Sequence, residues 1–335
     1  MSRHVLDVRN LSTAVSTRGG DLTIVDGLNL KVKRGETVAI IGESGCGKSL
    51  AALSLMRLLP KGRARIRAGE IRLEDRDLVK LRDRDVARLR GRDIAMIFQD
   101  PMSALNPVMT IGRQLEEAIR AHVDLKGEAL KARSIELLKL VHIPDPEARL
   151  KEYPHRLSGG MCQRIAIAMA IACDPRLLIA DEPTTALDVT IQAQVLQLLQ
   201  ELKARTGMAL LIITHDFGVV AEMADRVVVM YAGRKVEEGT VREIFNAPRH
   251  PYTQGLLALT LHPGQPKIDR LPEIRGVVPP YEARGAGCPF ADRCDKVMEV
   301  CRRQAPATIE LAKDHEVACW AAELESERYV VTVDH

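Results

Sequence analysis

Residues 42–49 read Gly-Glu-Ser-Gly-Cys-Gly-Lys-Ser, which matches the phosphate-loop pattern G-x-x-x-x-G-K-[ST]. The apolar run Val38–Ile41 predicts a strand before the loop, and residues 49–59 predict a helix after it. Glycines let successive backbone N–H groups point at phosphate oxygens, and the positive end of the helix dipole faces the same anion. We therefore predict a nucleotide phosphate site formed by Gly42, Glu43, Ser44, Gly45, Cys46, Gly47, Lys48 and Ser49.

Three residues of this loop have distinct expected roles. Lys48 is expected to reach the β and γ phosphates, and the Ser49 hydroxyl is expected to ligate Mg²⁺. Cys46 occupies a variable position of the pattern, and we interpret it as a structural residue.

Apolar runs alternate with helical patterns from about residue 37 to 231. The predicted strands are 37–41, 94–98, 177–180, 209–214 and 227–231, and helices are predicted at 49–59, 159–172 and 189–205. Two further amphipathic helices are predicted at 110–121 and 128–141. This alternation predicts an α/β fold with a parallel-sheet core, interrupted by a helical insertion at about 100–170.

A pair of acidic residues ends one of the predicted strands. Asp181 and Glu182 directly follow the apolar run Leu177–Ala180. A buried strand delivers Asp181 to the sheet edge beside the phosphate loop, where it can hold Mg²⁺ through water. Glu182 is then placed to polarise an attacking water molecule, whereas a strand end capped by solvated acids is the alternative.

The segment Leu157-Ser158-Gly159-Gly160-Met161-Cys162-Gln163-Arg164 resembles the signature motif of ATP-binding-cassette (ABC) ATPases. Its residues open a helix and can offer N–H groups and a hydroxyl to a γ-phosphate. The resemblance implies that this phosphate belongs to a nucleotide on the opposite subunit, so two chains close head-to-tail over two ATP molecules. The implied contact residues are Leu157, Ser158, Gly159, Gly160 and Gln163.

Other elements of the same family follow in order. Gln99 resembles the Q-loop glutamine that senses Mg²⁺ and the attacking water, and Asp188, in Ala186-Leu187-Asp188, resembles the D-loop aspartate. His215 resembles the switch histidine that contacts the γ-phosphate. The resemblance thus implies an active ATPase with Glu182, His215 and Gln99 as catalytic residues and Ser49, Gln99 and Asp181 around Mg²⁺.

The resemblance implies a P-loop ABC ATPase fold over residues 1–246, with an antiparallel β subdomain and a helical subdomain at about 100–170. After about residue 246 prolines interrupt regular patterns, and we expect a small extension at 247–335. Three segments, 100–107, 249–257 and 271–279, resemble the ATPases of dipeptide/oligopeptide (and nickel) importers, of the "D" subunit type.

That importer family implies a set of partners and a location. The partners are a second, similar ATPase, two membrane permeases and an extracytoplasmic substrate-binding protein. The expected location is the cytoplasmic face of the inner membrane, with the chain held there through the permeases. The cargo is expected to be a peptide, while nickel, glutathione or another small solute stays open.

Four of the seven cysteines lie in the extension, at Cys288, Cys294, Cys301 and Cys319. This spacing lacks the C-x₂-C pair of common zinc ribbons. Four thiolates can hold a [4Fe–4S] cluster, and the segment resembles the cluster motif of some peptide-importer ATPases. Zinc is the second possibility, with His315 able to replace one ligand, and unligated thiols are the third.

Composition limits the other functions. The net charge is only +3, and no apolar run approaches the 18 residues of a membrane span, nor does the first segment predict a signal peptide. We therefore expect no binding to nucleic acid through bulk charge. An ABC ATPase acting on nucleic acid or ribosomes remains the alternative, and the arginine-rich segment 61–92 is the feature that favours it.

The chain departs from the ABC family in one respect. No aromatic residue precedes Phe98, so the aromatic side chain that usually stacks on adenine upstream of the phosphate loop is missing. Arg18 lies in that region, and its planar guanidinium can stack on a base, although a solvated loop arginine is the plainer interpretation.

Overall fold

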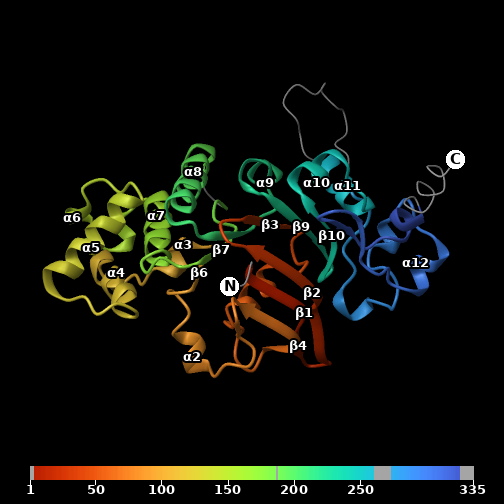
Figure 1. Ribbon diagram of the computed structural model, residues 1–335, viewed down its shortest axis with the longest axis horizontal. Coiled ribbons are helices and arrows are strands. Elements are labelled where there is room, and N and C mark those ends of the chain that lie inside the picture. Colours follow the sequence, from red (N-terminus) through yellow and green to blue (C-terminus); the bar gives the residue numbers. More distant parts are fainter. Residues whose placement is uncertain (1–3, 186–187, 260–272, 325–335) are drawn as a thin grey trace.

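The computed structural model describes residues 4–185, 188–259 and 273–324. An eight-stranded sheet forms its centre, in the order β11-β12-β10-β9-β3-β8-β7-β6 (Figure 1). The five strands that run parallel to one another are β3 (Thr37–Ile41), β6 (Ile94–Ile97), β7 (Leu177–Asp181), β8 (Ala209–Ile213) and β9 (Arg226–Tyr231). These strands confirm the predicted parallel core.

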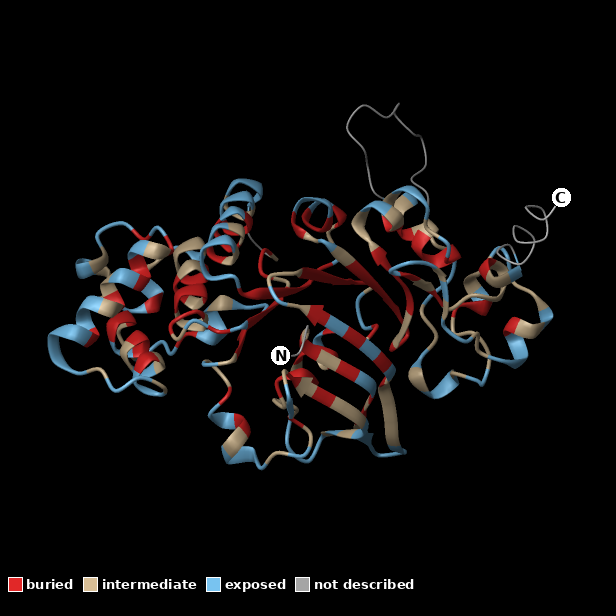
Figure 2. Ribbon diagram, in the orientation of Figure 1, coloured by how far each residue is buried: buried red, intermediate tan, exposed pale blue. Residues whose placement is uncertain are grey.

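Both faces of the parallel strands are covered, which explains their nearly continuous apolar sequences. Successive side chains of a strand point to opposite faces. In β7, Leu178 and Ala180 pack against the helical side, whereas Leu177 and Ile179 pack against the side of the antiparallel sheet. Figure 2 shows these central strands as buried and the outer surfaces of the helices as exposed.

A second, antiparallel sheet has the order β2-β1-β4-β5. It consists of β1 (His4–Thr17), β2 (Gly20–Lys33), β4 (Ala64–Leu73) and β5 (Arg76–Asp77). Its apolar face packs with α1 (Lys48–Leu55) against the central sheet. Apolar runs predict strands only at Val5–Val8 and Leu28–Val32, which are parts of β1 and β2, because exposed polar residues interrupt the apolar pattern over the rest of both strands.

A helical layer packs on the other face of the parallel strands and continues beyond β6 as a separate lobe, residues 111–149 (Figure 1). Its α-helices are α3 (Pro101–Ala104), α4 (Ile111–Arg120), α5 (Gly127–Leu140), α6 (Pro146–Arg149), α7 (Gly159–Ala170), α8 (Val189–Thr206) and α9 (Phe217–Met223), and η1 (Pro154–Arg156) is a short 3₁₀ helix. Polar side chains fix several of their beginnings, since Thr110, Ser158 and Asp188 each accept a backbone N–H of the first turn.

One predicted local feature, the end of the helix after the phosphate loop, differs from the structure. The helix after the phosphate loop ends at Leu55 rather than residue 59, because Arg57 adopts a left-handed backbone with φ of 51° and Pro60 follows. The arginine-rich segment 61–92 contains β4, β5 and α2 (Asp83–Ala87), and its charges form surface ion pairs such as Arg57–Asp83 and Arg82–Asp85.

The C-terminal region packs against the same central sheet. Strand β10 (Arg234–Thr240) and helix α10 (Val241–Asn246) lead into this region. Its own elements are α11 (Pro251–Ala258), η2 (Tyr281–Ala283), η3 (Ala291–Arg293), α12 (Glu299–Arg303), β11 (Ile309–Ala312) and β12 (His315–Val317). Strand β12 pairs antiparallel with β10, so the hairpin β11–β12 extends the sheet. Tyr231, Tyr252 and Phe290 form one aromatic cluster that joins β9 to this region.

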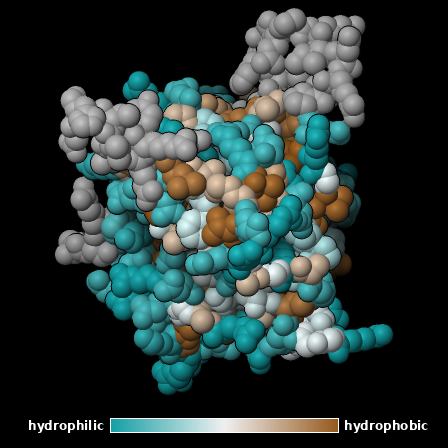
Figure 3. Space-filling model, turned by 90° about the vertical axis from the view of Figure 1, so that its right-hand side faces the viewer, coloured by the Kyte–Doolittle hydropathy of each residue, from teal (hydrophilic) through white to brown (hydrophobic). Residues whose placement is uncertain are grey.

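The surface on the C-terminal side is mainly hydrophilic, with hydrophobic residues scattered over it (Figure 3). No helix within the described ranges is long and apolar enough to cross a membrane.

Candidate active site

The phosphate loop lies between the end of β3 and the start of α1, as the motif predicts. Gly42 must lack a side chain, because a Cβ there would lie 2.2 Å from the carbonyl oxygen of Met230. Gly47 adopts a left-handed backbone with φ of 102° as the N-cap of α1. The N–H groups at this helix N-terminus are the ones that the motif assigns to the phosphates.

Lys48 is buried at the centre of the loop. Its Nζ donates to the carbonyl oxygens of Gly42 at 2.7 Å and Glu43 at 3.0 Å. The sulfur of Cys46 lies 3.9 Å from the same Nζ, and burial raises the pKa of this thiol. Cys46 therefore packs as an uncharged residue inside the loop, in line with its structural interpretation.

Asp181 and Ser49 meet across the site. The Ser49 hydroxyl donates to Asp181 Oδ1 at 3.2 Å, which places two of the three predicted Mg²⁺ ligands beside the phosphate loop. Burial raises the pKa of Asp181, and the hydrogen bond from Ser49 opposes that rise. A hydroxyl and a carboxylate are the hard oxygen ligands that Mg²⁺ accepts.

Glu182 lies at the centre of the second group of predicted residues. Its carboxylate accepts from Gln99 Nε2 at 2.9 Å and from the Thr185 hydroxyl at 2.8 Å, and His215 Nδ1 lies 3.3 Å from it. The structure thus brings Gln99, Glu182 and His215 together, and it adds Thr185, which the sequence analysis missed.

The backbone of Glu182 is strained. Its φ of 47° lies in the left-handed region, which costs a non-glycine residue about 1–2 kcal/mol, and its N–H donates to Ile213 at 2.8 Å. Such strain persists where the surrounding structure holds it and is concentrated at functional sites. No sequence pattern marks this conformation.

The signature residues open helix α7. Ser158 is its N-cap and accepts the N–H of Met161 at 3.3 Å, while Gly159 has open space around its Cα. Gln163 is buried and donates to the carbonyl oxygen of Pro183 at 2.7 Å, and Pro183 directly follows the predicted catalytic acid Glu182. Leu157 packs against the core of the helical layer.

No hydrogen bond or ion pair of the described residues joins Ser158–Gln163 to the phosphate loop of the same chain. The D-loop aspartate Asp188 is exposed and is the N-cap of α8, accepting the N–H of Ile191 at 2.9 Å. The preceding residues 186 and 187 lie outside the described residues.

Arg18 lies at the tip of the β1–β2 hairpin and is exposed. Sequence analysis offered it as a replacement for the missing aromatic residue that stacks on adenine, and this role stays a prediction.

The four C-terminal cysteines line one small cavity of about 20 Å³, formed by Cys288, Cys294, Cys301 and Cys319 with residues around them. Burial raises the pKa of Cys288 to about 11 and also raises those of Cys294 and Cys319. All seven cysteines of the chain are described and none forms a disulfide. Among the described residues, no three Cys, His, Asp or Glu side chains are gathered as a metal-ligating group.

Two histidines near this cavity have other partners. His315 does not line it, and its Nε2 lies 2.9 Å from Glu237 instead. His250 does line it, and its Nδ1 accepts the N–H of Tyr252 at 3.0 Å as the N-cap of α11. Burial lowers the pKa of His250 to about 4, so the ring is neutral at pH 7 and can accept this hydrogen bond.

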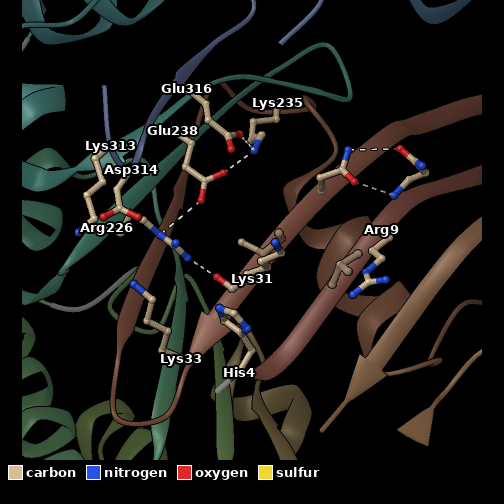
Figure 4. Close-up of a pocket in the computed structure, with 14 residues that line it drawn as sticks. His4, Arg9, Lys31, Lys33, Arg226, Lys235, Glu238, Lys313, Asp314 and Glu316 are labelled. Atoms are coloured by element: carbon tan, nitrogen blue, oxygen red, sulfur yellow. Dashed lines mark hydrogen bonds and ion pairs between the residues drawn. The ribbon is translucent and has the colours of Figure 1, made fainter. Parts of the chain in front are cut away.

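A separate basic groove lies between β2, β9 and the C-terminal hairpin, with a volume of about 660 Å³ (Figure 4). Six lysine or arginine residues and three acidic residues line it. Burial and the neighbouring Lys31 lower the pKa of His4 in this groove. Because Arg226 begins β9, the groove lies at the amino ends of the parallel strands, whereas the phosphate loop follows their carboxyl ends.

Comparison with known proteins agrees with this geometry. The family model described as "ABC transporter" matches residues 25–185, and that described as "Oligopeptide/dipeptide transporter, C-terminal region" matches residues 236–301. The chain is 51% identical to a protein of Sinorhizobium fredii named a probable peptide ABC transporter ATP-binding protein, over 94% of each chain. It is 48% identical to the dipeptide transport ATP-binding protein DppD of Bacillus subtilis, over 98% of each chain.

Solved structures show the same cassette. A dimeric ATP-binding cassette in a post-hydrolysis state, bound to ADP and phosphate, superimposes with a TM-score of 0.63 at 28% identity. That match covers 71% of this chain and 99% of the other. The cbiO1 protein of Clostridium perfringens, part of an ABC transporter complex, superimposes with a TM-score of 0.62 at 27% identity, covering 73% of this chain and 92% of the other.

The fold and the grouped acidic, glutamine and histidine side chains define an ATP-binding-cassette ATPase. Its matches extend over nearly the full chain and include the C-terminal region. The chain belongs to the family of ATP-binding subunits of peptide ABC transporters.

Proposed function

We propose that this chain powers the import of dipeptides or oligopeptides through a pair of membrane permeases. The observation that supports the cargo class is the match of residues 236–301 to the C-terminal region of oligopeptide/dipeptide transporters. The ATPase site also has its predicted acidic, hydroxyl and glutamine side chains in place. The other members of the complex are a second, different ATPase subunit and an extracytoplasmic substrate-binding protein. The chain lies at the cytoplasmic face of the inner membrane.

The proposed chemistry uses the residues gathered around Glu182. The phosphate loop binds the phosphates of ATP, and Ser49, Asp181 and Gln99 would hold Mg²⁺, which neutralises phosphate charge. Glu182 polarises the attacking water, and His215 contacts the γ-phosphate. The short distances from Glu182 to Gln99 and His215 support these roles.

The signature residues act on the nucleotide of the other subunit in this proposal. Ser158 already caps α7, and the open space at Gly159 lets a phosphate approach the backbone N–H groups. Asp188 lies exposed at the start of α8, where it can reach the same partner. ATP-driven closure of two such subunits would then move the permeases.

A surface beside the catalytic site is suited to contact a permease. Phe98, Met102 and Val108 are exposed large apolar residues around the short helix α3. Phe98 directly precedes Gln99, which contacts Glu182, so a permease element seated on this surface would be linked to the site.

We assign residues 1–246 to the ATPase domain, with the helical subdomain at about 100–170, and residues 247–335 to the C-terminal extension.

Deleting the gene for this chain should abolish uptake of a labelled dipeptide and leave uptake of labelled nickel and glutathione unchanged. Wild-type protein supplied from a plasmid should restore uptake, and the Glu182→Gln variant should not, because transport needs hydrolysis. Loss of nickel or glutathione uptake, with dipeptide uptake intact, would assign the other cargo.

We further propose that the four C-terminal cysteines hold a [4Fe–4S] cluster, with zinc as the second candidate. The support is that four cysteines from separate segments line one cavity, Cys288, Cys294, Cys301 and Cys319. Thiols lose their protons when they become metal ligands. Burial raises the pKa values of Cys288 and Cys319, so the bound metal must displace these protons. A cluster would need the side chains around this cavity of about 20 Å³ to move apart, whereas a single zinc ion, the second candidate, needs less room.

If the cysteines hold the cluster, anaerobically purified protein should contain close to four iron and four sulfide per chain and absorb visible light. A colourless protein with one zinc per chain would support the second candidate. The Cys301→Ser variant should lose the bound metal, whereas Cys173→Ser, which changes a cysteine outside the cavity, should keep it. A folded wild-type protein with neither metal would overturn the proposal.

A further inference from the structure

Three side chains of the C-terminal region contact the phosphate loop. The N–H of Glu43 donates to the Tyr252 hydroxyl at 2.8 Å, and the Tyr281 hydroxyl donates to the carbonyl oxygen of Gly45 at 2.7 Å. The guanidinium of Arg293 donates to both carboxylate oxygens of Glu43, at 2.6 and 3.0 Å. These partners lie at least 209 residues apart in the sequence, so the folded C-terminal region supports the loop from outside.

Arg293 is held more firmly than a surface arginine. Besides Glu43, it donates to the Tyr231 hydroxyl at 3.3 Å and to the carbonyl oxygens of Arg275 at 2.9 Å and Ile274 at 3.3 Å. A guanidinium has five N–H donors in a rigid plane, and these contacts engage all of them. Its side chain is only 5% exposed, so the geometry of the Glu43 pair is fixed by the structure around it.

We infer that Arg293 is a positioning residue of the ATP site, which holds Glu43 in place and neutralises its charge beside the bound triphosphate. Glu43 is the second residue of a loop that binds a strongly anionic group. An unpaired carboxylate there would repel the phosphates. Because the Glu43 side chain is only 27% exposed, water and salt screen this repulsion weakly. The bidentate pair removes this repulsion and fixes the beginning of the loop.

The segment that carries Arg293 also carries two cysteines of the cavity. Arg293 precedes Cys294, and the N–H of Cys288 donates to Cys301 at 2.7 Å. Phe290 of the same turn packs on Tyr231 and Tyr252. The contact with the phosphate loop and the wall of the cysteine cavity are therefore built from one turn of the chain.

The test is a double-mutant cycle on the full chain, with Arg293→Met, Glu43→Gln and the two combined. Equilibrium binding of Mg-ATP and steady-state hydrolysis are measured for each. We expect Arg293→Met to weaken ATP binding about tenfold, with KM raised more than kcat is lowered. Glu43→Gln should change binding less than about threefold, and adding it to Arg293→Met should recover most of the lost affinity.

The control is Arg302→Ala. Arg302 lies in the same region and pairs with Asp292 at 2.8 Å, but both side chains are exposed, and such pairs contribute little. This variant should bind ATP like the wild type. A structural role limited to folding would give the same loss in Arg293→Met with or without Glu43→Gln, and that result would overturn the inference.

Arg293→Lys keeps the charge and loses the bidentate geometry, so it serves if the methionine variant does not fold. We expect it to weaken ATP binding about threefold in a protein with a normal melting temperature. Wild-type affinity in a folded Arg293→Met or Arg293→Lys variant would also overturn the inference.

Discussion

Replacing Glu182 with glutamine should leave ATP binding intact and slow ATP hydrolysis by at least about 100-fold. Glutamine has nearly the same shape, so the contacts with Gln99 and Thr185 can be kept. The amide cannot accept a proton from water or place a negative charge beside it, and a positioned general base contributes about 10²–10⁴-fold to rate. The change therefore removes chemistry without removing the site.

Equilibrium ATP binding and single-turnover hydrolysis measure the two effects separately. Glu128→Gln is a matched control, because it makes the same chemical change at an exposed residue of α5. Hydrolysis by Glu182→Gln at the wild-type steady-state rate would refute the role of Glu182.

Replacing Lys48 with alanine should weaken ATP binding by roughly 100-fold, which corresponds to about 2.7 kcal/mol. The ammonium group is buried and already donates to the carbonyl oxygens of Gly42 and Glu43, so it is held where the phosphates bind. Hydrogen bonds from a charged donor contribute about 1.5–3 kcal/mol each. Lys48→Ala also leaves two loop carbonyl oxygens without this donor.

Binding of a fluorescent ATP analogue measures the loss, and the melting temperature reports whether the loop carbonyls destabilise the fold. Lys61→Ala removes an exposed lysine and should bind the analogue normally. If Lys48→Ala binds ATP within about threefold of the wild type, the assigned role of Lys48 is wrong.

Local patterns predicted the parallel core and most of the side chains that the structure groups around Glu182. The apolar runs before Gly42 and Asp181 form the buried strands β3 and β7, and Ser158 begins α7. These predictions succeed because a strand buried on both faces and a capped helix are encoded by neighbouring residues. The grouping of Gln99, Glu182 and His215 follows from parallel strands that end at one edge of the sheet.

The exposed and C-terminal elements were harder to predict. The 14-residue strands β1 and β2 were recognised only in part, since their sequences alternate irregularly where the register shifts. The hairpin β11–β12 was not predicted, because its short strands are stabilised by pairing with β10 rather than by their own composition. The domain limits and the site roles stay predictions.

The sequence by itself determined that the chain binds nucleotide phosphates and belongs among the ABC ATPases. Each of the two motifs, the phosphate loop and the signature motif, is a single unbroken run of residues. Their chemistry is that of backbone N–H groups at helix N-termini, which local sequence encodes. Only the tertiary structure decided that Arg293 pairs with Glu43 across 250 residues, and that Glu182 adopts a left-handed backbone. Contacts between distant residues depend on how sheets and helices pack, and no local spacing encodes that packing.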